Sequence, residues 1–139
     1  MALIVVMALS FSAACTHQVS PNTPAAPAHP GQANQFDGQA YDAIVTVRAV
    51  VTSLVDQKAQ FPQYAQQIEE ARVSFNSLQA LYLSYHNTAI LTPNSPDLLQ
   101  IQLQLSSGLA TIATQLTTLQ TAFGKTPTPV TIPQVGATK

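Results

Sequence analysis

Few side chains of this 139-residue chain could perform acid–base chemistry, because only 8% of its residues are charged. Glu69 and Glu70 are adjacent carboxylates within a stretch of helical periodicity. Neighbouring residues of a helix point about 100° apart, so these two carboxylates do not converge on one substrate. Arg72 follows Glu69 by three residues, a spacing typical of helical ion pairs. We therefore predict a surface ion pair here and no catalytic carboxylate pair.

Histidine is the other residue type that could bind a metal or act as a base. His86 has no His, Cys or carboxylate three or four residues away, which is the spacing that local metal sites need. Its place near the end of a predicted helix suits the helix dipole instead. His17 and His29 lie in a Pro-rich segment and are expected to be solvated. With no nucleophile elbow, phosphate-binding loop or dinucleotide fingerprint, we predict no enzyme activity, metal or cofactor.

The single cysteine, Cys15, stands at the end of an apolar N-terminal run. Residues 2–11 are apolar except for Ser10, and residues 12–14 are Ser-Ala-Ala. A bilayer crossing needs ~20 apolar residues, so this run is short for a span and suits the hydrophobic region of a signal peptide. A secretory signal with an unrelated Cys, an uncleaved anchor and a buried core segment are the alternatives that the residues leave open.

The small-small-Cys pattern that ends this run resembles the lipobox of bacterial lipoproteins, a resemblance confined to residues 1–15. It implies that residues 1–14 are a signal peptide and that the Cys15 thiol carries a diacylglyceryl group. Such a lipid holds a chain on a membrane, since each buried CH₂ contributes ~0.8 kcal/mol. Thr16 follows the Cys where retained inner-membrane members often carry Asp, which implies the outer membrane, facing the periplasm, in a bacterium with two membranes.

Composition divides the rest of the chain into three parts. Residues 15–39 contain four prolines at three-residue spacing, which predicts an extended linker between the lipid and the domain. Residues 40–123 show helical periodicity and are the predicted domain. Residues 124–139 are rich in Thr and Pro and are expected to be a short disordered tail.

Apolar residues recur at steps of three and four in three segments of the domain, about 40–60, 62–88 and 96–123. Pro62 separates the first two segments, and a continuous kinked helix is the alternative there. Pro93 and Pro96 separate the last two, and Gly124 is suited to end the third helix. Short connections favour antiparallel neighbours, so the predicted fold is all-α, an up-down-up three-helix bundle with a heptad-like, coiled-coil-type seam.

The polar faces of these helices are almost neutral. Residues 40–123 contain 27 Gln, Thr and Ser residues and only eight charged ones. Asp97 is the sole charge of the third segment, whose neutral residues are Gln100, Gln102, Gln104, Ser106, Ser107, Thr111, Thr114, Gln115, Thr117, Thr118, Gln120 and Thr121. Burying neutral groups against a partner is easier than burying charges, although compositional bias of the organism would give the same pattern.

From this helix we select one candidate interaction face: Gln100, Gln104, Ser107, Thr111, Thr114 and Thr118. Its partner would be an envelope protein or a second copy of the chain. Nucleic acid is not expected, because the chain has five basic residues and a net charge of −1. The sequence thus predicts a membrane-anchored envelope lipoprotein with a non-enzymatic interaction or scaffold domain.

Two further functions remain open at this stage. The C-terminal Lys139 is similar to that of the murein lipoprotein, whose terminal Lys amine is joined to peptidoglycan, and this resemblance implies a link between membrane and cell wall. Alternatively, a small apolar ligand could bind between the helices beside Tyr64, Phe75, Tyr82 and Tyr85.

Overall fold

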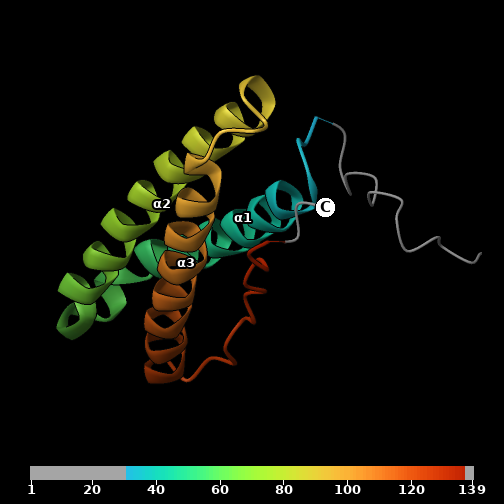
Figure 1. Ribbon diagram of the computed structural model, residues 1–139. Coiled ribbons are helices and arrows are strands. Elements are labelled where there is room, and N and C mark those ends of the chain that lie inside the picture. The colour runs from blue at the N-terminus through green and yellow to red at the C-terminus, as the bar shows by residue number, and fades with distance from the viewer. Residues whose placement is uncertain (1–30, 137–139) are drawn as a thin grey trace, which may run out of the picture.

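A computed structural model describes residues 31–136, which form three long helices and no strand. The helices are α1 (Gln35–Asp56), α2 (Ala65–Leu91) and α3 (Asp97–Ala122). Two short 3-10 helices, η1 (Lys58–Gln60) and η2 (Pro62–Tyr64), connect α1 to α2. Each long helix contacts the other two, and α1 lies obliquely across the α2–α3 hairpin (Figure 1). The prediction of an all-helical fold is therefore confirmed.

The breaks between helices lie at the predicted prolines. Phe61 separates η1 from η2, which begins at Pro62, so α1 and α2 are separate helices and not one kinked helix. The third helix ends before Gly124, whose φ of 67° is accessible to glycine with little strain. Its successor Lys125 donates a backbone hydrogen bond to the Gln120 carbonyl, which closes the helix end.

The first helix begins at Gln35, earlier than the predicted start at residue 40. Asn34 caps it, because the Asn34 side chain accepts a hydrogen bond from the Asp37 backbone amide at 3.0 Å. Phe36 is fully buried and its ring meets that of Tyr85 edge-on, with centroids 4.9 Å apart. The Pro-rich composition upstream places this turn in the predicted linker, residues 15–39. The buried Phe36 ring instead makes the turn part of the domain.

One core joins the apolar stripes of the three helices, and most predicted inward positions are buried. They include Ile44, Val47, Val51 and Leu54 of α1, Ile68, Phe75, Leu78, Tyr82 and Tyr85 of α2, and Leu105, Leu109, Ile112 and Leu116 of α3. Tyr41 falls on the same repeat of threes and fours in α1, three residues before Ile44, and is nevertheless 45% exposed. Mid-helix Gly108 permits the close approach of α2 and α3, because a Cβ atom at this position would collide with the Leu78 side chain.

Beyond Gly124 the chain does not form a disordered tail, and that prediction is wrong for the described residues. Residues 125–136 run back along α3 beside α1 (Figure 1). We call this segment the strap. Pro133 is fully buried, and Val130, Ile132 and Val135 pack against the core. The Thr/Pro composition predicts disorder because the few apolar residues of this segment are spaced apart. In the structure these apolar residues pack against the core.

Hydrogen bonds fix the strap along its length. Gln120 holds Thr128 by two of them, at 3.0 and 3.1 Å. Ser106 donates to the Pro133 carbonyl at 3.0 Å, and the Gln134 amide donates to the Gln39 side chain at 3.0 Å. The strap therefore joins the last turns and the middle of α3 to the beginning of α1.

Removal of the Phe36 ring tests whether the domain includes the first turn of α1. We expect Phe36→Ala to lower the free energy of unfolding by about 3–5 kcal/mol, because it leaves a cavity beside Tyr85. Tyr41→Ala, in the same helix but half exposed, is the control and should have a much smaller effect. Urea unfolding followed by circular dichroism measures both, and equal effects of the two substitutions would contradict the burial of Phe36.

Candidate functional site

The described residues present two features with functional potential: a groove between α2 and α3, and a buried polar network at the start of α1. The predicted interaction face on α3 belongs to the first. All six of its residues, Gln100, Gln104, Ser107, Thr111, Thr114 and Thr118, are exposed. No charged residue occurs in α3 after Asp97, so this whole face is neutral.

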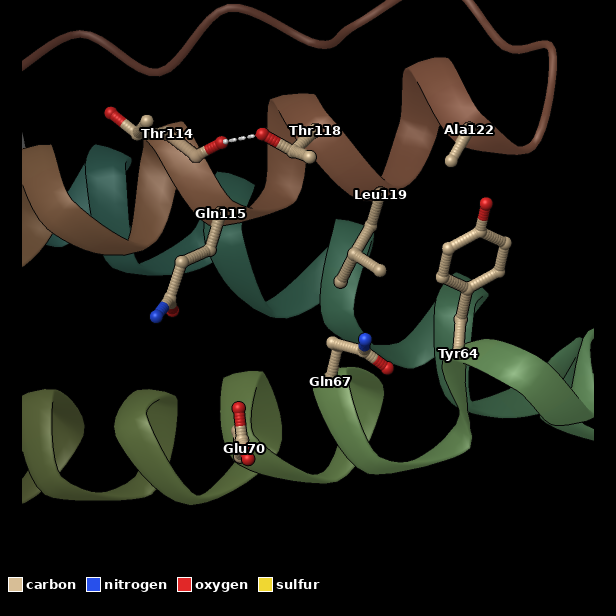
Figure 2. A pocket seen from close by; sticks show the side chains of 8 residues that line it. All are labelled: Tyr64, Gln67, Glu70, Thr114, Gln115, Thr118, Leu119 and Ala122. Atoms are coloured by element: carbon tan, nitrogen blue, oxygen red, sulfur yellow. Dashed lines mark hydrogen bonds between the residues drawn. The ribbon is translucent and has the colours of Figure 1, made fainter.

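The threonines of this face are less polar than their composition suggests. Thr111, Thr114 and Thr118 each donate a hydroxyl hydrogen bond to the carbonyl four residues earlier, at 3.0–3.1 Å. Figure 2 shows the bond from Thr118 to Thr114. Because these hydroxyl protons are already bonded within the helix, covering the face with a partner leaves none of these donors unpaired.

Beside this face a groove of about 260 Å³ separates the first half of α2 from the second half of α3. Its lining is Tyr64, Gln67, Glu70, Thr114, Gln115, Thr118, Leu119 and Ala122. In Figure 2 the ring of Tyr64 stands at one end near Ala122, and Gln115 extends from α3 toward α2. A mainly apolar groove edged by side-chain amides and the Glu70 carboxylate is suited to a peptide segment or the side chains of a partner helix.

The aromatic residues proposed to surround an apolar ligand do not share this groove. Tyr64 lines it, whereas Phe75, Tyr82 and Tyr85 are at most 7% exposed and belong to the core. Tyr64 also contacts Phe123, whose ring stacks on Phe61 with centroids 3.9 Å apart. These aromatic contacts close the end of the bundle where α1 meets α2.

The predicted surface ion pair between Glu69 and Arg72 is present, and Lys58 approaches the same carboxylate at 3.6 Å. The hydrogen bond from Arg72 is the main reason why the pKa of Glu69 is lowered. Both side chains of the pair are more than two-fifths exposed, so the pair contributes little to stability. Glu70 is not part of this ion pair. Its side chain lines the groove and accepts a hydrogen bond from Gln66 at 2.9 Å.

The second feature is centred on Asp37, a fully buried carboxylate in the first turn of α1. Its Oδ2 accepts a hydrogen bond from the Ala33 amide at 2.8 Å and lies 2.8 Å from His86 Nδ1. At this distance the two side chains form a hydrogen bond, which an ionised carboxylate accepts from an Nδ1–H group. The interpretation of His86 as a residue held by the helix dipole therefore missed its main partner, which is 49 residues away in the sequence.

Tyr85 and Gln102 extend this polar network through the core. Tyr85 donates its hydroxyl hydrogen bond to Asn34 Oδ1 at 3.1 Å and accepts one from the Gln102 amide at 3.0 Å. Gln102 Oε1 in turn accepts from the Gly136 amide of the strap at 3.3 Å. We placed Gln102 and Gln120 on the outer face of the third helix, which is wrong: they are 2% and 7% exposed. Both instead hold the strap.

Burial governs the ionisation of the tyrosines in this region. It raises the pKa of Tyr82, and the neighbouring Asp37 carboxylate raises it further. Burial also raises the pKa of Tyr85, against which its hydrogen bonds to Gln102 and Asn34 act. Both hydroxyls therefore stay protonated at neutral pH and act as hydrogen-bonding groups.

Within residues 31–136 no three His, Cys, Asp or Glu side chains gather as metal ligands would, and no helix is long and apolar enough to cross a membrane. Cys15 and Lys139, the predicted lipidation and peptidoglycan attachment residues, lie outside the described part of the chain, as do His17 and His29. Lipidation and wall attachment thus stay predictions.

Comparison with known proteins finds no matching family model, curated protein or solved structure.

The network predicts a difference between two glutamines of α3. Gln102→Ala should lower the free energy of unfolding on the order of 1–3 kcal/mol and accelerate hydrogen exchange at the Gly136 amide, since both Tyr85 and the strap lose a buried partner. Gln100→Ala removes an exposed side chain of the same helix and is the matched control. Exchange at Gly136 that is equally slow in both variants would contradict the assigned network.

Alkaline pH should weaken the domain through its buried tyrosines. As pH rises above about 10, tyrosines of the unfolded chain lose protons while Tyr82 and Tyr85 keep theirs, so the unfolded state is favoured. The stability conferred by these two residues is complete below the unfolded pKa and is lost as pH rises toward the raised folded values. Urea unfolding over this range should show a smaller loss in the double variant Tyr82→Phe/Tyr85→Phe. An identical alkaline loss would argue against this assignment.

Proposed function

We propose that this chain is a lipid-anchored protein of the bacterial cell envelope whose helical domain binds another envelope protein without catalysing a reaction. Cys15 carries the lipid, residues 16–30 connect it to the domain, and the domain is an up-down-up three-helix bundle. In a bacterium with two membranes its place is the outer membrane, facing the periplasm. The lipobox-like segment is the basis for the anchor, and the neutral surface of α3 is the basis for binding.

One observation carries the binding function: the exposed face of α3 is neutral and its threonine hydroxyl protons are bonded within the helix. This arrangement gives no advantage to a surface that contacts only water. When a partner covers the surface, however, no charged side chain of α3 has to be desolvated. Thr114 and Thr118 place this face at the edge of the groove. The groove then receives an apolar or aromatic side chain of the partner beside Leu119.

A photo-crosslinking amino acid at Thr118 tests this interface. In cells that make the full chain, position 118 should form one discrete adduct with an envelope protein, while the exposed α1 residue Thr52 serves as the control position and should form none. Adding Thr114→Arg should strongly reduce the adduct, because a guanidinium at the edge of the groove would have to be desolvated.

Two results would contradict this function. Equal labelling from Thr118 and Thr52 would indicate random collisions, and an adduct with the mass of two copies of the chain would identify self-association instead. Intact-mass analysis of the same membrane fraction tests the anchor separately, because a chain that begins at an acylated Cys15 has a defined mass.

A further inference from the structure

The end of the α2–α3 hairpin exposes large apolar side chains. Ile90 and Leu91 in the last turn of α2 are 50% and 79% exposed, and Leu99 in the first turn of α3 is 55% exposed. We call these three residues the apolar tip. In Figure 1 the turn that joins α2 to α3 projects beyond α1, so α1 does not cover it. Leu91 is the most exposed of the large hydrophobic residues in the described part of the chain.

The start of the described chain lies against this same end. Ala33 and Asn34, directly before α1, line one hollow with Leu99 and with Pro93 and Pro96 of the hairpin turn. Cys15 stands 16 positions before Gly31. A fully extended chain of that length spans at most ~55 Å. The segment that leads to Cys15 thus joins the domain at the end that carries the apolar tip, and a lipid on Cys15 keeps that end within ~55 Å of the membrane surface.

The hairpin end has no basic residue that could attract an anionic lipid headgroup. Residues 90–99 contain no Lys or Arg, and Asp97 is their only charged residue. The described basic side chains lie elsewhere: Lys58 and Arg72 pair with Glu69, Arg48 stands over the Phe75 ring, and Lys125 follows the far end of α3. Attraction to anionic headgroups is therefore unavailable at the tip, and apolar insertion is what its residues can provide.

We infer that the apolar tip is a second membrane contact, in which Ile90, Leu91 and Leu99 enter the boundary between headgroups and acyl chains of the anchoring bilayer. Three side chains bind weakly by themselves, and the anchor makes this contact effective by raising the local concentration of membrane. The inference rests on the proposed lipid anchor. It also orients the domain: the hairpin end faces the bilayer, and the groove near Tyr64, at the opposite end of α2, faces away from it toward the partner.

A tryptophan introduced at the tip can report this contact, since the chain contains no Trp and a single Cys. The chain from Cys15 onward, which keeps every described residue, is coupled through Cys15 to a maleimide phospholipid in phosphatidylcholine vesicles. We expect the emission of Leu91→Trp to shift to the blue and to be quenched by lipids brominated on their acyl chains. Gln63→Trp, exposed at the opposite end of α2, is the matched control and should stay unquenched.

Adding Ile90→Ser and Leu99→Ser to the Leu91→Trp variant should reduce quenching several-fold, because less apolar area enters the bilayer. Quenching should be insensitive to salt, since no basic residue lies at the tip. Circular dichroism establishes that each variant keeps its helices.

Absence of quenching at position 91 in the coupled, folded protein would overturn the membrane contact and leave the proposed anchor standing. A blue shift that grows with protein density but is not quenched by brominated lipid would also overturn it, by assigning the tip to a second copy. Because coupling is chemical, the outcome does not depend on natural acylation, which intact-mass analysis tests separately.

Discussion

A buried carboxylate cannot lose water without gaining other partners, and Asp37 is such a group at the first turn of α1. The Ala33 amide and His86 supply them for Oδ2, whereas the buried Oδ1 has no hydrogen-bond partner among the described residues. Next to it, Asn34 both caps α1 and accepts from Tyr85. These bonds determine where the start of α1 lies relative to the second half of α2. Breaking any of these bonds would leave a further buried polar group unpaired, so the bonds constrain the alignment of the two helices.

The same network explains why the strap has a defined path. The Gln102 side chain accepts a hydrogen bond from the Gly136 amide and donates one to the Tyr85 hydroxyl, so this one side chain connects the core to the C-terminal segment. Apolar residues of the strap then pack where α1 and α3 diverge. At the other end of the bundle, the Phe61 ring stacks on Phe123 and joins the α1–α2 connection to the end of α3 by apolar contact. The domain thus has a buried polar network near one end and a cluster of aromatic rings at the other, and its groove lies near the aromatic cluster.

The low charge of this domain has a different consequence on each of two surfaces, the outer face of α3 and the hairpin end. On the outer face of α3 it combines with internally bonded threonines to give a surface that a protein partner can cover. At the hairpin end it combines with Leu91 and its neighbours to give a surface suited to lipid. The groove beside that face and the apolar tip lie toward opposite ends of the hairpin, so in the proposed arrangement one domain contacts a membrane and a partner at once.

The sequence by itself determined the helical class, the three long helices, their breaks and most of the core, because amphipathic periodicity, proline and glycine act locally. It also identified the exposed face of α3 and the Glu69–Arg72 pair, for the same reason. It could not reveal that His86 meets Asp37 or that Gln102 is buried while Gln100 is exposed. Only the tertiary structure decided these points, since they depend on groups brought together from distant parts of the chain. The start of α1 at Gln35, with Phe36 buried, and the ordered strap belong with them, because burial against other helices overrides the Pro-rich composition of both segments.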